Sequence, residues 1–336
     1  MHLSAEVTDL LEVCMCQYSF LFLPQDNAGE TEDKLVIANT HLLFNPRRGD
    51  IKLAQLMILM AEIDRHAYLG PSHEIRSRLH PYSWDTVGTG RYCPIVVTGD
   101  FNMEPHSEMY KFMVSGQMDY EGLLVRQISG QEEGMYGRNQ LLDRNFFSPR
   151  YGVSDFCQYH MAVVGRLKDS CKMDNDALPA EGADQSDIGS VSQSQTESNT
   201  TDSSSTEDSL SKCPPPMPIN TGRLWHHLNL VSAYRHRVKR LGNQMEVTTH
   251  HNNGKCSVDY IFYTVCNKEV RFQRDEVRLS KIQDGKLKLI ARYGLMSAKE
   301  LDNMGGIPNP VLPSDHLCLI ARFLLMWLVR AATELL

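Results

Sequence analysis

The sequence predicts an α/β fold, a sandwich of mixed β-sheets and helices. Short runs of β-branched and aromatic residues alternate along the chain with stretches whose apolar residues recur at helical spacing. These elements do not follow the strict βαβ rhythm of a wholly parallel sheet, which favours a mixed sheet. With 336 residues, of which 42% are hydrophobic, the chain can bury a large core.

Five segments have the composition of strands. The run at 94–98 is apolar almost throughout, and the run at 257–263 alternates with β-branched and aromatic side chains. Four of the five end in, follow or contain an acid, amide or imidazole group, which predicts polar chemistry at strand ends. The five predicted strands are residues 35–38, 94–98, 257–263, 286–292 and 317–323.

Two segments have the pattern of amphipathic helices. Asp50 is expected to cap a helix that continues to about His66, because its apolar residues recur at i, i+3 and i+4. A second helix is expected to begin near Pro105 and to present Phe112 on its apolar face.

Composition divides the chain into five parts. One segment is rich in Ser, Thr, Gln, Asp and Asn and has too few large apolar side chains to offset the entropy of ordering, so it is predicted to be disordered. We expect an atypical segment at 1–33, the two parts of one domain at 34–168 and 223–324, a disordered acidic insertion at 169–222, and a variant tail at 325–336.

The net charge of −7 is concentrated in that insertion. Between Met173 and Ser211 lie nine acidic residues and no lysine or arginine, so the remainder carries a net charge of about +2. A near-neutral domain can bind a nucleic acid when its cations are gathered at the site. The overall negative charge therefore does not exclude RNA as a partner.

Cysteine spacing and hydropathy indicate the compartment. Nine cysteines occur without a Cys-x-x-Cys pair, which argues against a disulfide framework and a zinc ribbon. The longest apolar run, 317–329, is too short to span a bilayer and contains Arg322. We expect an intracellular, cytoplasmic protein with no membrane partner, and the sequence does not identify protein partners.

Asp100 and Asn102 follow the apolar strand at 94–98, with Gly99 between them and the strand. A carboxylate at this position can bind a hard cation or accept a proton from water, and an amide can hold a phosphoryl oxygen. The alternative interpretation is an Asx-turn without catalytic function.

A second polar group comes from the last third of the chain. His316 with the adjacent Asp315 can bind metal or transfer protons near neutral pH, and Asp259 can orient and charge a histidine from within its strand. The alternatives are a capping Asp, a partly buried His and a strand-edge Asp that faces solvent.

Four further residues are candidates for substrate contact. Asn39 and His41 close the strand at 35–38 and can reach a phosphate, and Arg47 and Arg48 could pair with one. An arginine pair in a loop is also compatible with simple solvation.

These residues carry a resemblance to a known family. The motifs occur in the order seen in the endonuclease/exonuclease/phosphatase superfamily. Within it, the chain resembles the branch of Ccr4, nocturnin and the Angel proteins, and the segment 39–50 is most similar to Angel. The four motifs are Asn39-Thr40-His41-Leu42, Gly99-Asp100-Phe101-Asn102, Val258-Asp259-Tyr260-Ile261-Phe262 and Ser314-Asp315-His316-Leu317.

The resemblance implies a four-layer sandwich of two mixed β-sheets flanked by helices, with Mg²⁺, or Mn²⁺ in its place, at the strand ends. It implies hydrolysis of RNA phosphoesters, as a 2′,3′-cyclic phosphatase, a 3′–5′ poly(A) exonuclease or both.

The resemblance also implies a role for each motif residue. Asp100 would deprotonate the attacking water and bind metal, and Asn102 would hold the phosphate. His316, oriented by Asp259, would stabilise or protonate the phosphoryl oxygens. Asp315 would help to anchor the metal, and His41 would contact phosphate.

One feature of the family pattern is missing. The family's first metal ligand is a glutamate in a Gln-Glu-Val motif upstream of the Asn-Thr-His segment, and no Gln-Glu-Val precedes Asn39 here. We therefore expect a fold that is incomplete at the N-terminus and a chain with little or no activity. The alternative to an enzyme is an inactive fragment that binds RNA or protein.

Overall fold

The computed structural model describes residues 34–71, 90–131, 139–166, 217–238, 244–251, 254–273 and 276–326. The predicted N-terminal segment 1–33, most of the predicted disordered insertion and nearly all of the C-terminal tail lie outside the described residues. No helix in the described part is both long and apolar enough to cross a membrane.

A four-stranded mixed sheet forms the centre of the fold, in the order β1-β4-β12-β7. β1 pairs with β4 in parallel, and β12 pairs antiparallel with both β4 and β7. The predicted mixed α/β fold is therefore confirmed. The bounds are β1 Val36–His41, β4 Ile95–Asp100, β7 Leu230–Ser232 and β12 Asp259–Thr264.

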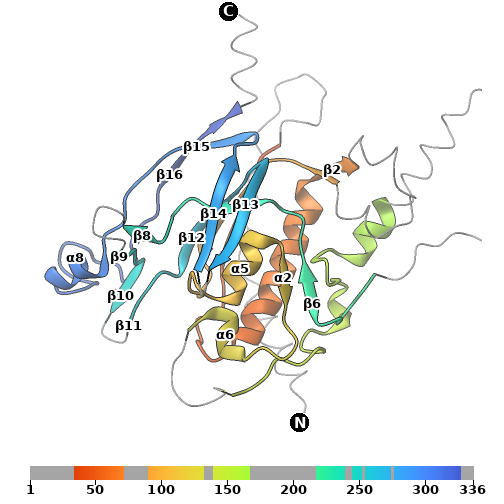
Figure 1. Ribbon diagram of the computed structural model, residues 1–336, viewed down its shortest axis with the longest axis horizontal. Helices are drawn as coiled ribbons and strands as arrows, with labels where there is room; N and C mark the ends of the chain where they lie inside the picture. The colour runs from red at the N-terminus through yellow and green to blue at the C-terminus, as the bar shows by residue number, and fades with distance from the viewer. Residues whose placement is uncertain are drawn as a thin grey trace, which may run out of the picture.

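One face of this sheet is covered by helices. Alternate strand residues, such as Val36 and Ala38 of β1 and Val97 of β4, belong to a core that also contains side chains of three helices. Because successive side chains of a strand point to opposite faces of the sheet, every second side chain faces the helical layer. Figure 1 shows the helices together behind the strands; they are α2 Gly49–Ala67, α5 Glu108–Ser115 and α6 Val125–Ser129.

The other face of the sheet packs against a further layer of strands. The intervening residues, including Leu35, Val96 and Tyr263, form a second core with Leu287 and Phe323. β15, Leu287–Arg292, and β16, Ala321–Leu325, pair antiparallel there. Helices, central sheet and outer strands are thus three layers of the predicted sandwich.

The remaining elements are short pairs and turns around these layers. β13 and β14 form the long hairpin at the front of Figure 1. The bounds of all these remaining elements are β2 Tyr68–Pro71, β3 Gly90–Tyr92, β5 Gln117–Asp119, a 3₁₀ turn Pro149–Tyr151, β6 Arg223–Trp225, β8 Arg237–Val238, β9 Gln244–Met245, β10 Thr249–His251, β11 Gly254–Cys256, β13 Asn267–Gln273, β14 Glu276–Gln283 and α8 Ala298–Asn303.

Two predicted helix starts were wrong in detail. Arg48 is the N-cap of α2, and Asp50 lies inside the first turn, where its carboxylate accepts from the Arg48 guanidinium at 3.0 and 2.9 Å. α5 is capped by Ser107 rather than started by Pro105, because the Ser107 hydroxyl accepts from the Tyr110 amide.

Two predicted boundaries also moved. The last strand begins at Ala321 rather than at 317, because the segment before it bonds to Thr248 and leaves the regular ladder. The end of the predicted insertion, 217–222, is ordered: Met217 is buried, and the Asp155 carboxylate accepts from the backbone N–H groups of Asn220 and Thr221.

Candidate active site

Strand register brings three predicted site residues to one edge of the central sheet. His41 is the register partner of Asp100 across the parallel β1–β4 pair, and Asp259 is its partner across the antiparallel β4–β12 pair. Both pairings follow from the alternation of apolar side chains, since a slip by one residue would turn each strand's core residues outward. Asp100 therefore lies between His41 and Asp259.

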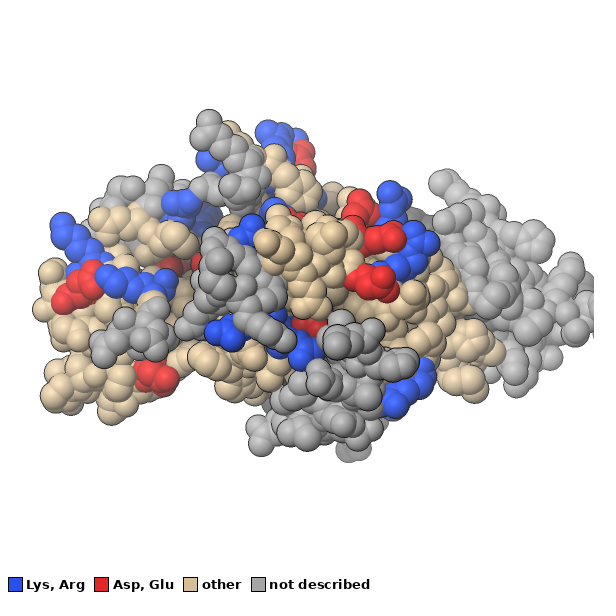
Figure 2. Space-filling view, turned by 90° about the horizontal axis from the view of Figure 1, so that it is seen from below, with Lys and Arg blue, Asp and Glu red and all other residues tan. Residues whose placement is uncertain are grey.

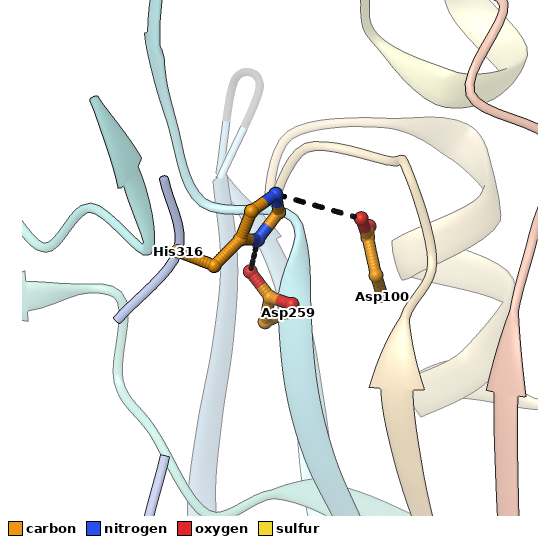
Figure 3. Close-up of side chains that lie close together, drawn as sticks. All are labelled: Asp100, Asp259 and His316. Atoms are coloured by element: carbon orange, nitrogen blue, oxygen red, sulfur yellow. Dashed lines mark hydrogen bonds and ion pairs between the residues drawn. The ribbon is translucent and has the colours of Figure 1, made fainter. Parts of the chain in front are cut away.

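His316 reaches the same point from a distant loop. Its Nδ1 lies 2.8 Å from Oδ2 of Asp259, and its Nε2 lies 3.9 Å from Oδ2 of Asp100. Figure 3 shows the imidazole between the two carboxylates, with its second nitrogen directed at Asp100. The contact that the predicted orienting role of Asp259 requires is present, and the role itself stays a prediction.

The two threonines at 248 and 249 hold the His316 loop in place. Thr249 forms a β-bridge with His316, and its hydroxyl donates to the Asp315 carbonyl at 2.8 Å. The Leu317 amide donates to the Thr248 carbonyl at 2.7 Å. The Thr248 hydroxyl also accepts from the Asp259 amide at 3.2 Å. One short segment therefore positions both partners of the Asp259–His316 pair.

The charges of the site depend on each other. The hydrogen bond that Nδ1 of His316 donates to the Asp259 carboxylate raises the pKa of His316 to about 8, which favours the protonated imidazole at neutral pH. Burial, and then the nearby Asp259 carboxylate, raise the pKa of Asp100 above its ordinary value. Asp100 thus lies in a site with an excess of negative charge, which a bound cation would offset.

His41 lies at the open side of the site. Its Nε2 is 3.5 Å from Oδ2 of Asp100, and 69% of its side chain is exposed. An exposed imidazole next to a half-buried carboxylate can reach a substrate without leaving its strand. The predicted contact of His41 with phosphate stays a prediction.

Asn102 lies below the site rather than open to it. Its side chain is buried, and its Nδ2 donates to the Leu42 carbonyl at 2.9 Å. Its backbone N–H donates to Oδ1 of Asp100 at 2.8 Å. Asn102 therefore joins the loops that follow β1 and β4 and orients the Asp100 carboxylate. Its predicted contact with phosphate stays a prediction.

Gly99 allows the backbone to pass close to β1 at this point. Its φ is +139°, and a Cβ at this position would lie 1.8 Å from the Thr40 carbonyl oxygen. Only glycine fits both constraints. Phe101 then fixes the following turn, with its ring edge-to-face against Tyr260 and Phe262 at centroid distances of 5.8 and 5.4 Å.

The remaining predicted residues lie outside the central cluster. Asp315 is exposed and is not among the three side chains that approach one another; it contributes a weak raising influence on the pKa of His316. Arg48 is engaged by Asp50, which weakens its predicted contact with phosphate. Asn39 is exposed and accepts from the Thr98 hydroxyl at 3.0 Å, and Arg47 is exposed in the loop before α2.

Residue-type reasoning missed two contributors to the site. Thr248 was assigned no role from the sequence. Lys52 lies in the first turn of α2 and is completely buried beneath the loop that contains Asp100. Its signal in the sequence was a single cation in the stretch 51–61, where Gln55 is the only other polar residue.

The two carboxylates of the cluster could together hold a metal ion, with His316 beside them. Ligand atoms of Asp100, Asp259 and His316 all lie within 4.8 Å of one another. Mg²⁺ is commonly bound by one or two carboxylates, with waters and substrate oxygens completing its shell. Burial and then the neighbouring Asp259 carboxylate raise the pKa of Asp100, and a bound cation would offset both effects. The predicted Asp100 ligand is compatible with this arrangement.

The chain is similar to curated Angel proteins over most of its length. Protein angel homolog 2 of Bos taurus is 35% identical over 303 residues, which cover 90% of this chain and 46% of that protein. Protein angel homolog 1 of Rattus norvegicus is 34% identical, over 86% of this chain and 42% of that protein. The chain thus spans a little under half the length of these relatives. No family model matches it.

Two further comparisons support the same placement. Carbon catabolite repressor protein 4 homolog 6 of Arabidopsis thaliana is 38% identical over 108 residues, which cover 32% of this chain and 11% of that protein. The crystal structure of ANGEL2, a 2′,3′-cyclic phosphatase, in complex with adenosine-2′,3′-vanadate superposes with a TM-score of 0.53 and 30% identity, covering 87% of this chain and 57% of that chain. The chain is a homologue of the Angel proteins, in the Ccr4-like branch of the endonuclease/exonuclease/phosphatase superfamily.

Proposed function

We propose that the chain is a Mg²⁺-dependent phosphoester hydrolase that acts on RNA ends and removes 2′,3′-cyclic phosphates. The observation that carries the proposal is the line of Asp259, His316 and Asp100, with the imidazole 2.8 and 3.9 Å from the two carboxylates. The similarity to a solved 2′,3′-cyclic phosphatase that holds adenosine-2′,3′-vanadate supports this substrate class.

Each side chain has a role that its surroundings support. Asp100 accepts a proton from the water whose oxygen forms the new bond to phosphorus, and the Asn102 N–H, which donates to its Oδ1, holds its carboxylate in place. His316, which is protonated below about pH 8, donates its Nε2 proton to the ribose oxygen that leaves as the first phosphorus–oxygen bond breaks, and this opens the cyclic phosphate to a phosphomonoester. A second water, used in the same way, breaks the remaining phosphorus–oxygen bond and releases inorganic phosphate. The Asp259 carboxylate accepts the hydrogen bond from Nδ1 of His316 and stabilises the imidazolium.

Mg²⁺ would be held by Asp100, next to Asp259, and Mn²⁺ could replace it. When bound, such an ion neutralises charge on the phosphoryl group and lowers the pKa of bound water. The metal requirement is tested by chelation. Activity should disappear in EDTA and return with excess Mg²⁺, and turnover that persists in EDTA would contradict the metal part of the proposal.

The face of the molecule drawn in Figure 2 has no single basic patch. Lys and Arg side chains are interspersed there with Asp and Glu. In this proposal the RNA contacts are local, at the edge of the sheet where His41 and His316 lie. A weak dependence of KM on salt is the expected consequence.

The test uses the purified 336-residue chain with Mg²⁺ and two RNAs, one ending in a 2′,3′-cyclic phosphate and one in a poly(A) tail. We expect loss of the cyclic phosphate and a decrease in kcat of about 10²-fold or more for Asp100→Asn. Asp315→Asn is the matched control, because Asp315 is an exposed acid outside the cluster.

Each other outcome identifies a different function. Shortening of the poly(A) tail without loss of the cyclic phosphate would assign exonuclease activity instead. A folded chain that binds RNA but turns over neither substrate would make it a binding module and overturn the proposal.

A further inference from the structure

Lys52 is a buried cation with two specific acceptors. It is 0% exposed, which is rare for lysine, since desolvating an ammonium costs free energy unless it is hydrogen-bonded. Its Nζ donates to the Asn102 carbonyl at 2.9 Å and to Oε1 of Gln131 at 2.5 Å. The side chain thus connects α2, the loop after β4 and the segment after α6.

The acceptor on Asn102 belongs to a turn that the backbone adopts with difficulty. Asn102 has a φ of +46°, in the left-handed region that non-glycine residues seldom occupy, and Gly99 at the start of the turn has a φ of +139°. Such conformations persist only where surrounding contacts hold them. The Lys52 hydrogen bond is one of these contacts.

The same turn fixes the proposed base. The Asn102 N–H donates to Oδ1 of Asp100, and its side chain donates to the Leu42 carbonyl, so this residue is bonded on three sides when Lys52 is included. A shift of the Asn102 peptide would therefore move the Asp100 carboxylate relative to His316. The Lys52 ammonium is also within electrostatic range of Asp100, whose negative charge favours its protonated form.

We propose that Lys52 is a positioning residue of the hydrolytic site, which holds the Asp100–Asn102 turn in the geometry required for proton transfer. This inference rests on the proposed function for its kinetic consequence. It also has a consequence that does not depend on activity: without Lys52, the N–H of Asn102 should lose its protection from hydrogen exchange.

The test compares Lys52→Met with Lys268→Met. Methionine retains most of the volume of lysine without the charge or the donors. Lys268 is the matched control, because it is also a partly buried lysine, its Nζ donates to the Leu230 carbonyl at 2.5 Å, and burial lowers its pKa to about 7, as it does for Lys52. Lys268 lies on β13, outside the site.

We expect Lys52→Met to lower kcat by about 10²-fold with KM changed less than about twofold, the pattern of a misplaced catalytic group. The Asn102 amide should exchange faster than in the parent chain, while amides in β12 should stay protected. Lys268→Met should leave kcat and the Asn102 amide unchanged. Equal kcat values for the two variants, with unchanged exchange at Asn102, would overturn the proposal.

Two further arms make the result decisive. If Lys52→Met does not fold, Gln131→Leu is tested in its place, because it removes one acceptor of Lys52 at a position nearer the surface. This variant should show a smaller decrease in kcat, with faster exchange at Asn102. An unchanged Gln131→Leu variant would then count against the role of Lys52. If the parent chain turns over no RNA, the proposed function fails, and hydrogen exchange alone decides the role of Lys52.

Discussion

Replacing Asp259 with Asn tests the electrostatic account of the site most directly. The substitution keeps the shape of the side chain but removes the negative charge that bonds to Nδ1 of His316. In the parent chain this bond is the first cause of the rise in the pKa of His316 from 6.5 to about 8. Without it, the pKa of His316 should return towards 6.5.

The expected change in folding stability follows from the size of the His316 pKa shift. Each pKa unit corresponds to about 1.4 kcal/mol, so the full shift corresponds to about 2 kcal/mol of preference for the charged imidazole. A third of the His316 side chain is exposed, so solvent screens part of this, and about 1 kcal/mol of folding stability is expected.

The direction of the His316 pKa shift determines the pH range over which it stabilises the fold. Because the folded-state pKa of His316 lies above its unfolded value, its stabilising effect is complete below pH 6.5 and is lost as pH rises through about 8. The difference in unfolding free energy between the parent chain and Asp259→Asn should therefore shrink by about 1 kcal/mol between pH 6 and pH 9.

The assay is an NMR titration of the His316 ring protons without added metal, combined with urea unfolding at both pH values. Asp315→Asn serves as the control, because Asp315 is only a minor cause of the His316 shift. If the pKa of His316 is the same in the parent chain and in Asp259→Asn, the reasoning is refuted.

Two more substitutions test how the fold supports the site. Gly99→Ala should destabilise the chain by about 3 kcal/mol or more, because the new Cβ would lie 1.8 Å from the Thr40 carbonyl at a φ of +139°; a urea midpoint equal to that of the parent chain would contradict this. Asp64→Ala should cost about 3–5 kcal/mol, since it leaves the partly buried Arg166 and Tyr92 without their shared acceptor at 2.7 and 2.6 Å. Calorimetry measures that loss, and the kcat of the folded fraction should not change.

The strands and the residues at their ends could be predicted from the sequence. The nearly continuous apolar run at 94–98 and the alternation in 257–263 indicate strands wherever they lie in space. The mixed sheet and the adjacency of Asp100 and Asp259 agree with that prediction. These properties depend on side-chain periodicity, which each segment carries by itself.

Element ends were less predictable, because capping depends on single hydrogen bonds. Asp50 and Ser107 are both favourable capping residues, yet only the Ser107 hydroxyl accepts from its helix. The Asp50 carboxylate is paired with Arg48 instead. A polar side chain near a helix start can bond either to the helix backbone or to a neighbouring side chain. The path of the preceding chain decides between the two.

The sequence by itself determined which strands form and that Asp100, Asp259 and His316 belong to one kind of site. Only the tertiary structure decided that the Thr249 bridge places His316 against Asp259, 57 residues away in the sequence. It also decided that Asp315 stays outside the cluster and that Lys52 is buried beneath the Asp100–Asn102 turn. The physical reason is the distance along the chain over which each property is set. Periodicity is a local property of the chain, whereas the partner and burial of a polar side chain depend on segments that meet only after folding.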